Sequence, residues 1–254
     1  MKVNRLFRVL VLGLGLTLAL LVGLHKTHAG PAALTRYVTT GGNDGGGTSS
    51  CTPSSLPCRT VQQAVDVAAN GDEIHVASGI YTGVQARNGV TQVVYINKTV
   101  ALRGGYTTTL DGWTTPYPLT QPTTLDAGGL GRVVYITGDI SPTLDGFIIA
   151  HGNATGLRAN CHSDADGCGG GIFVLDAHPI VVNNVITNNI AAVTTANPTY
   201  TTGYGGGLYM NGAIRAVISG NLIISNAGST AYCGAGGGIY LYPYANTLSL
   251  RVTG

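Results

Sequence analysis

The sequence predicts an all-β fold of the solenoid type, in which short strands coil into rungs that stack on one another. Three glycine triplets, each followed by an aliphatic and an aromatic residue, begin at Gly169, Gly205 and Gly236. They recur after 36 and 31 residues. This irregular period predicts that each repeat has a constant core and a loop of variable length, as stacked repeats do.

Short strands and paired asparagines support this prediction. From Glu73 onward most predicted strands are three to five residues long, which is too short for a sandwich of long strands. Residues 184–189 and 221–226 both begin and end with asparagine, whose amide can bond to an amide stacked on it. We expect these two segments to stack in neighbouring rungs. Residues 146–151 fit the same frame more loosely, with His151 at the terminal asparagine position.

One short helix is predicted ahead of the strands. Val61, Ala64, Val65 and Ala68 follow the spacing of an amphipathic helix, and an Asn-Gly pair ending at Gly71 supplies the stop. The apolar interior of the first rung would otherwise face water, so we expect this helix to cap it.

Residues 1–29 have the pattern of a secretory signal peptide. Lys2, Arg5 and Arg8 form a basic start, residues 9–24 carry no charge, and small residues precede the expected cleavage after position 29. The apolar run of 16 residues is shorter than the roughly 20 that a membrane span needs. Cleavage and export are therefore favoured over an uncleaved anchor, and we expect a secreted or extracellular-surface protein with no membrane span in the mature chain.

The mature chain would carry little charge. Four of the 13 basic residues lie in the leader, which leaves 9 basic and 11 acidic side chains, so the composition gives no support to nucleic-acid binding. Glycine is abundant at 39 residues, but the apolar content of 44% and the lack of a Gly-X-Y register exclude collagen and simple disorder.

The chain divides into three predicted parts. Residues 1–29 are the leader, residues 30–58 form an N-terminal extended segment with a disulfide loop, and residues 59–254 form the solenoid. The last residues have the pattern of a strand and turn of a rung in progress, so we expect the solenoid to be incomplete at its C-terminus.

Five cysteines in an exported chain predict disulfides. Cys51 and Cys58 have six residues between them, and Cys161 and Cys168 have the same spacing, so we predict two local bridges. Cys233 would lie two rungs from Cys168, roughly 9–10 Å away at the usual strand spacing. This exceeds the roughly 7 Å limit on Cα separation for a bridge. Cys233 is therefore expected to be free or paired outside the chain.

Several segments of the chain have the pattern of a known family. Residues 60–65, 70–76 and 79–82 resemble the amino-terminal opening, and residues 144–149 the rung repeats, of right-handed parallel β-helix proteins of the pectin-lyase-like superfamily. The alternating glycine-rich and asparagine-rich strands are also similar to repeats of bacterial polymorphic outer-membrane proteins. The resemblance covers roughly residues 35–254 and implies a right-handed parallel β-helix. It implies no single activity, because the superfamily places lyases, hydrolases, adhesins and passengers on one scaffold.

The candidate catalytic residues are Asp126, Asp145 and Arg132, with Arg103 in the same region. Lyases of the superfamily hold calcium between carboxylates of neighbouring rungs and use an arginine or lysine as the base. If Asp126 and Asp145 stacked on adjacent rungs, their carboxylates would lie about 5 Å apart, which suits a shared cation or an acid/base pair. The favoured alternative is that each aspartate bonds to its own backbone in a turn. The paired aspartates and the Gly-His-Gly and Arg-x-Lys segments of the superfamily's hydrolases do not occur.

A candidate calcium loop contains Asp164 and Asp166 before the glycine at 167. Alternating oxygen ligands before a sharp turn suit a hard cation. The loop lacks the downstream bidentate glutamate, since the only glutamate of the chain is Glu73. A solvated acidic loop is therefore the favoured alternative, and calcium is the one cofactor that the sequence suggests.

A candidate ligand-binding strip contains Phe173, Tyr209 and Tyr240. The aliphatic residue before each ring is expected to point inward, so the rings would point outward. Rings at rung spacing form a surface on which sugars can stack, and Tyr204 and Tyr232 in the adjoining loops would form its walls. The favoured alternative is an aromatic ladder that stabilises the fold without binding a ligand.

Two classes of function follow. The favoured one is a non-catalytic β-helix that binds a polysaccharide or cell-surface glycan, or that mediates surface contacts. The alternative is a polysaccharide lyase or glycoside hydrolase that acts on acidic polysaccharides. The glycine triplets place residues 153–167, 189–204 and 226–235 side by side along one edge, and we expect the contact surface there.

Overall fold

The computed structural model describes most of the chain after residue 31. The described residues are 32–45, 50–109, 112–158, 160–162, 165–193, 202–212, 215–230 and 233–242, together with the backbone of 251–253. The chain divides into the units Met1–Ala32 and Ala33–Gly254, and every element described below lies in the second. The predicted leader lies outside the described residues and stays a prediction. Within the described part, no helix is long and apolar enough to cross a membrane.

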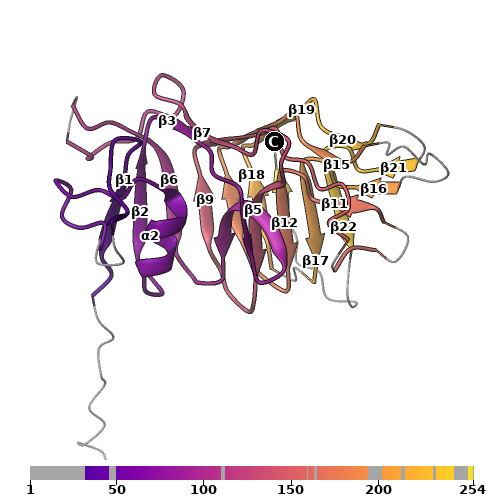
Figure 1. The fold of residues 1–254 in the computed structure, drawn as a ribbon, viewed down its shortest axis with the longest axis horizontal. Helices are drawn as coiled ribbons and strands as arrows, with labels where there is room; N and C mark the ends of the chain where they lie inside the picture. The colour runs from indigo at the N-terminus through magenta and orange to yellow at the C-terminus, as the bar shows by residue number, and fades with distance from the viewer. Residues whose placement is uncertain are drawn as a thin grey trace, which may run out of the picture. The chain divides into compact units, whose positions relative to one another are not determined.

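Three long sheets make up the fold (Figure 1). The first sheet has the order β1 (Thr35–Val38), β2 (Glu73–Ala77), β6 (Ala101–Tyr106), β9 (Thr143–Asp145), β13 (Ile180–Val182), β18 (Val217–Ser219) and β23 (Arg251–Thr253). The second sheet has the order β3 (Gly79–Tyr81), β7 (Thr123–Asp126), β10 (Phe147–Ala150), β14 (Val185–Thr187) and β19 (Leu222–Ile224). The third sheet has the order β4 (Gln85–Arg87), β5 (Val90–Ile96), β8 (Arg132–Thr137), β12 (Ile172–Leu175), β17 (Leu208–Asn211) and β22 (Ile239–Tyr242).

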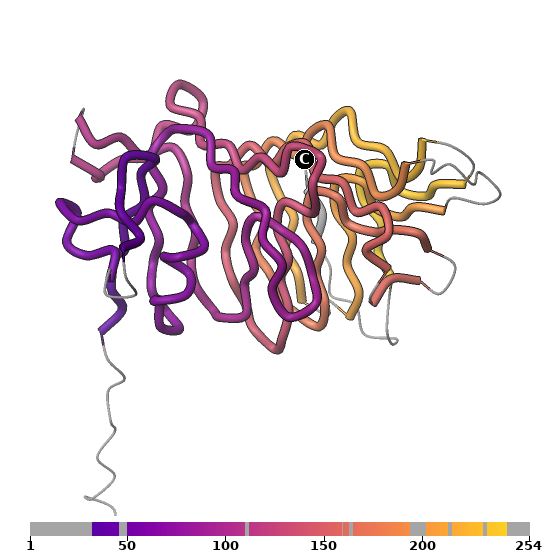
Figure 2. The backbone as a smooth tube through the Cα atoms, viewed as in Figure 1, coloured from indigo at the N-terminus to yellow at the C-terminus, as the bar shows by residue number. Residues whose placement is uncertain are grey.

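Two smaller sheets lie in the connections between the second and third sheets. One has the order β11 (Gly167–Cys168), β16 (Thr202–Tyr204) and β21 (Cys233–Ala235), and the other joins β15 (Ile190–Ala192) to β20 (Ala227–Ser229). Among the described strands every pairing is parallel except that of β4 with β5. Each strand pairs with its counterpart in the next turn of the chain, which the backbone trace in Figure 2 shows turn by turn. The predicted parallel β-helix is confirmed.

Aliphatic side chains fill the interior in ladders. In the first sheet, Ile74, Leu102, Leu144, Val181 and Ile218 stand opposite one another in successive strands, and each is at most 2% exposed. The second and third sheets contribute matching rows to the same buried cluster. Burying one such side chain contributes about 1.5–3 kcal/mol, so the stacked rungs share one continuous core.

Asparagine ladders close the corners of the second sheet. Val185 pairs with Leu222, which stacks Asn184 on Asn221 as predicted, and the Asn184 amide donates to the Asn221 Oδ1 at 3.0 Å. The predicted position of His151 is wrong by one residue. Ile148 pairs with Val185, so Gly152 takes the terminal asparagine position, where its amide donates to the Asn189 Oδ1 at 2.8 Å.

The predicted capping helix is α2 (Val61–Val67), which packs against β1, β2 and β5. Thr60 is its N-cap and accepts a hydrogen bond from the Gln63 amide at 3.2 Å. The Gln62 side chain bonds both backbone groups of Tyr95, with its Oε1 accepting from the Tyr95 amide at 2.7 Å. The helix is thereby fixed to the first strand pair of the third sheet.

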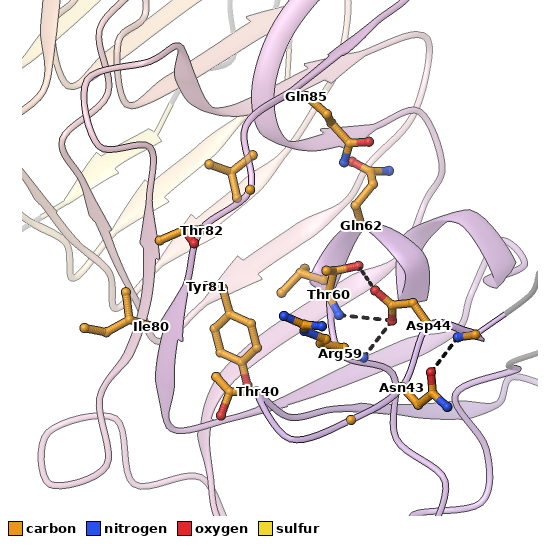
Figure 3. Close-up of a pocket in the computed structure, with 15 residues that line it drawn as sticks. Thr40, Asn43, Asp44, Arg59, Thr60, Gln62, Ile80, Tyr81, Thr82 and Gln85 are labelled. Atoms are coloured by element: carbon orange, nitrogen blue, oxygen red, sulfur yellow. Dashed lines mark hydrogen bonds between the residues drawn. The ribbon is translucent and has the colours of Figure 1, made fainter.

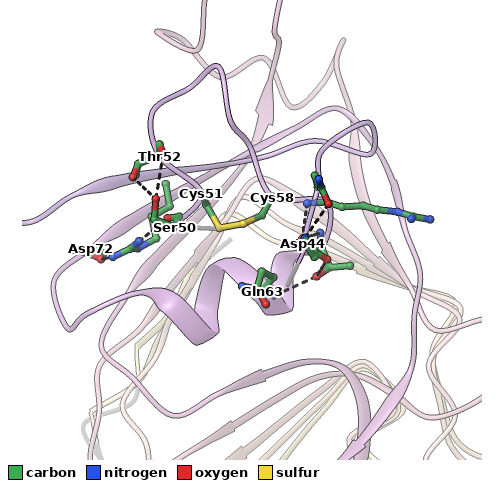
Figure 4. Close-up of a disulfide and its surroundings, with 12 residues drawn as sticks. Asp44, Ser50, Cys51, Thr52, Cys58, Gln63 and Asp72 are labelled. Carbon is green, nitrogen blue, oxygen red and sulfur yellow. Dashed lines mark hydrogen bonds and ion pairs between the residues drawn. A yellow bond between two sulfur atoms is a disulfide. The ribbon is translucent and has the colours of Figure 1, made fainter. Parts of the chain in front are cut away.

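Both predicted disulfides are present. Cys51 pairs with Cys58, and Cys161 with Cys168, at Cα separations of 4.8 and 5.9 Å. Figure 4 shows the first bridge beside α2. Cys233 is free and exposed on β21, two strands away from the strand that carries Cys168.

The glycine triplets are corners, as predicted. Their first residues, Gly169, Gly205 and Gly236, share the left-handed φ angles of +63°, +62° and +61°, a conformation that glycine adopts without strain. The backbone of the second residue of each triplet lies close to another backbone segment of the protein. A Cβ on Gly170 would lie 2.2 Å from the Ile190 carbonyl oxygen, so no larger residue fits there without a shift.

Candidate functional site

Five aromatic rings form a ladder on the outer face of the third sheet. Tyr95, Tyr135, Phe173, Tyr209 and Tyr240 stand opposite one another in β5, β8, β12, β17 and β22. Successive ring centroids are 5.6, 4.8, 5.3 and 5.6 Å apart, and each pair is stacked. The predicted three-ring ladder therefore exists and extends two strands further toward the N-terminus.

The centre of this ladder is covered, so the prediction of an exposed sugar-binding strip is wrong there. Phe173 and Tyr209 are both fully buried. Between β10 and β11, Cys161 packs against the cluster that contains both rings, and the Asn211 side-chain amide donates to the neighbouring Asn160 carbonyl at 3.0 Å. An uncovered row of rings would expose a large apolar patch to water, which explains why a loop covers it. Tyr204 and Tyr240 are half-buried, and Tyr232 lies outside the described residues.

Arg132, at the start of β8, lies beneath this cover and does not face solvent. It is fully buried, and its guanidinium carbon lies 4.6 Å from the Phe173 ring centroid. Its Nε donates to the Cys168 carbonyl at 2.9 Å and its Nη2 to the Leu157 carbonyl at 2.6 Å. Burial lowers the pKa of Arg132 to about 10, so it stays protonated at neutral pH. Its role in the structure is to join the covering loop to the ladder.

The two candidate catalytic aspartates do not stack, which corrects the predicted acid/base pair. Asp126 lies in the second sheet opposite Ala150, whereas Asp145 lies in the first sheet opposite Arg103. They are separated because each rung passes from the first sheet to the second between these positions. The Asp126 Oδ1 accepts from the Gly128 amide at 2.8 Å, which is the turn role that was favoured.

Asp126 and Asp145 each have other partners. The Asp126 Oδ2 lies 2.9 Å from the His151 Nδ1, and His151 is about half-exposed. The Asp145 Oδ2 lies 2.6 Å from the Arg103 Nη1. Arg103 also contacts Glu73 at 2.7 Å. The outer face of the first sheet thus carries a row of charges that neutralise one another.

His75 joins that row and was not found from the sequence. Its Nε2 lies 3.0 Å from the Glu73 Oε1, and its ring stacks on Tyr106 with centroids 3.9 Å apart. Burial lowers the pKa of His75, and the nearby Glu73 carboxylate opposes this effect. The register of β2 on β6 places His75 beside Arg103, but strand alternation alone does not reveal which neighbours a histidine meets.

Asp166, the described aspartate of the candidate calcium loop, is bonded to other residues of the protein. Asp166 forms an ion pair with Arg158, and its Oδ2 accepts from the Thr202 amide at 2.9 Å. Asp164 lies outside the described residues. Within the described ranges no three His, Cys, Asp or Glu side chains form a group that could hold a metal ion.

A polar cleft opens at the N-terminal end of the solenoid and was missed by the sequence analysis. Its volume is about 560 Å³. Its walls are the 40–45 loop, the start of α2 and the chain from β3 to β4, as Figure 3 shows. The polar side chains that line it are Thr40, Asn43, Asp44, Arg59, Thr60, Gln62, Thr82 and Gln85.

Asp44 fixes two of these walls to each other. Its Oδ1 accepts from the backbone amides of Arg59 and Thr60 at 2.7 and 3.2 Å, and its Oδ2 accepts from the Thr60 hydroxyl at 2.7 Å. The neighbouring disulfide ends at Cys58, whose carbonyl accepts from the Thr39 amide at 2.9 Å. The cleft is therefore held by cross-links that do not depend on a ligand.

Arg59 differs from the other charged residues around the cleft. Figure 3 shows its side chain between Tyr81 and Asp44 in the cleft. It is exposed and forms no ion pair or side-chain hydrogen bond with any residue that the structure describes. No spacing rule singles out Arg59, because the cleft is assembled from segments that are distant in sequence and from an irregular loop.

Of the comparisons with known proteins, the one with family models gave a match. A family model described as a protein of unknown function (DUF1565) matches residues 40–242. Comparisons with curated proteins and with solved structures found no match. The resemblances to pectin-lyase-like proteins and to polymorphic outer-membrane proteins therefore stay predictions beyond the β-helix itself. Because the match covers most of the chain, the protein belongs to the DUF1565 family.

Proposed function

We propose that this protein is a secreted or cell-surface β-helix module that binds a glycan in its N-terminal cleft without cleaving it. The observation that carries the proposal is the cleft itself, whose volume of about 560 Å³ lies within the range of roughly 300–1,000 Å³ typical of ligand sites. The two disulfides are compatible with an extracellular protein.

The lining of the cleft suits a polar, hydroxyl-rich ligand. Hydroxyl and amide side chains of Thr40, Asn43, Thr82 and Gln85 line it, and such groups both donate and accept hydrogen bonds, as sugar hydroxyls do. The walls are cross-linked through Asp44 and the nearby disulfide. A preformed site loses less conformational freedom on binding, which favours affinity.

A lyase or hydrolase is the second candidate, and less supports it. Asp126 and Asp145 lie in different sheets, and Arg132 is buried beneath a loop. The residues proposed for catalysis therefore do not meet at one solvent-facing point.

The test is binding of the chain from residue 30 onward to an array of oligosaccharides, followed by analysis of the recovered glycans. We expect retention of at least one glycan with its chain length unchanged. Thr82→Trp places a large ring in the cleft and should abolish retention. Thr120 is also exposed but does not line the cleft, so Thr120→Trp should keep retention.

Three results would count against the proposal. The first is retention of no glycan, and the second is equal retention by the Thr82→Trp variant. Shortened glycans among the recovered products would favour the enzyme candidate instead.

A further inference from the structure

Among the residues that the structure describes, the charges around the cleft leave one cation without an ion-pair partner. Both carboxylate oxygens of Asp44 accept hydrogen bonds from the start of α2. Next to the lining residues, Arg87 binds Asp66 through two hydrogen bonds of 2.5 and 2.7 Å, so that pair is neutral. Lys98 donates to three carbonyls at the end of α2. Arg59 is the one cationic residue that lines the cleft, and its guanidinium forms no ion pair or hydrogen bond with any residue that the structure describes.

We propose that Arg59 makes the cleft selective for glycans that carry a carboxylate, as sugar acids do. This inference rests on the proposed function. A guanidinium group presents a planar fork of N–H donors that matches the two oxygens of a carboxylate, and such bidentate pairs are stronger than neutral hydrogen bonds.

The remainder of the cleft cannot supply this selectivity. Its other polar side chains are hydroxyls and amides, apart from the Asp44 carboxylate. Hydroxyls and amides hydrogen-bond to a neutral sugar as well as to its acid, and they carry no charge that would attract the carboxylate. A negative charge on the ligand would be repelled by Asp44 and attracted by Arg59 alone. Preference for the acid therefore depends on one residue.

The backbone of Arg59 is held in place while its side chain is exposed. The Arg59 amide donates to Asp44 at 2.7 Å, and the preceding residue, Cys58, is bridged to Cys51. The Cα is thereby fixed at the wall, and the guanidinium is available to a ligand. A substitution that shortens or neutralises this side chain should leave the wall unchanged.

The experiment is calorimetric titration with matched pairs of tetrasaccharides in the gluco, galacto and manno series. Within each pair, one member has a C6 hydroxymethyl group on every sugar and the other has a C6 carboxylate. We expect at least one carboxylated member to bind about 10- to 100-fold more tightly than its neutral partner, as one charged hydrogen-bonded contact predicts. The preference should weaken with added salt.

Variants of the chain identify the residue responsible. Arg59→Gln should bind the two members of the pair with equal affinity, and Arg59→Lys should restore part of the preference because it restores the charge without the fork. Arg215→Gln removes an exposed arginine that does not line the cleft and should keep the full preference.

The failures of this inference and of the proposed function are distinguishable. Equal binding of acid and neutral members, abolished by Thr82→Trp, would overturn the selectivity of Arg59 and leave glycan binding in place. The same conclusion follows if Arg59→Gln keeps the preference, or if sulfated tetrasaccharides bind and carboxylated ones do not. Binding of no member of any series would overturn both.

Discussion

The aromatic ladder and the N-terminal cleft both lie outside the aliphatic core, yet their polar groups are used differently. In the ladder, the buried Arg132 donates to two carbonyls and stacks on Phe173 beneath a covering loop. In the cleft, the exposed Arg59 has no partner among the described residues. The same residue type thus has a structural role in one region and is available to a ligand in the other. The partners of an arginine, more than its residue type, therefore indicate whether it stabilises the fold or can contact a ligand.

The largest expected effect is on the ladder. Phe173→Ala should lower the free energy of unfolding by about 3–5 kcal/mol, because a fully buried ring between Tyr135 and Tyr209 is replaced by a cavity. Urea denaturation measures this loss. Tyr240→Ala, at the half-buried end of the ladder, should cost less. Equal losses for the two variants would show that the cover over Phe173 does not persist in solution.

Removal of each disulfide should affect one region and not the other. Each bridge joins cysteines seven positions apart, and closing so short a loop contributes about 2–3 kcal/mol. The double variant Cys161→Ser/Cys168→Ser should expose the ladder to a hydrophobic dye and leave glycan binding unchanged. Cys51→Ser/Cys58→Ser should weaken glycan binding, because it frees the segment that precedes Arg59. Weaker glycan binding in Cys161→Ser/Cys168→Ser, with dye binding in Cys51→Ser/Cys58→Ser, would contradict the different roles of the two regions.

Alkaline pH should report on the cover over the ladder. Burial raises the pKa of Tyr209 to about 12 from its usual 10, so above pH 10 the unfolded chain loses this proton and the folded chain keeps it. The free energy of unfolding should therefore fall between pH 10 and 12, by up to about 3 kcal/mol from this group. Denaturation at several pH values measures the fall, which Tyr209→Phe should reduce. An identical pH profile in Tyr209→Phe would contradict the burial of this hydroxyl.

The smallest effect on stability is expected in the cleft. Arg59→Gln should change the free energy of unfolding by less than about 0.5 kcal/mol, because an exposed side chain that has no partner among the described residues contributes little. Urea denaturation of this variant next to the parent chain checks it. A loss above about 1 kcal/mol would mean that Arg59 has a structural partner, and the contrast with Arg132 would disappear.

Much of the fold was predictable because aligning the repeats in the sequence indicates which residues pair in neighbouring strands. The glycine triplets predicted the pairing of β12, β17 and β22, and the asparagine pairs predicted the pairing of β14 with β19. Equal cysteine spacing predicted both bridges. The prediction aligned residues 146–151 with residues 184–189, whereas in the structure residues 147–152 align with them. Glycine at 152 offers no side-chain amide to mark its place under Asn189.

The site was less predictable because it depends on contacts between irregular segments. Strand alternation predicted that Phe173 and Tyr209 point outward, but it contains no information about the loop that buries them. The cleft forms where a loop residue, Asp44, meets the start of α2 near β3. Neither segment has a periodic pattern that predicts the encounter, and the contact surface expected at the variable loops stays a prediction.

The most direct test of the account is a backbone amide chemical-shift titration with the glycan that binds most tightly in the array. We predict that the shifts concentrate in residues 40–45, 59–62 and 80–85, which line the cleft, and that β12, β17 and β22 show none. Shifts that concentrate in the strands of the aromatic ladder, with the cleft unaffected, would contradict the assignment of binding to the cleft.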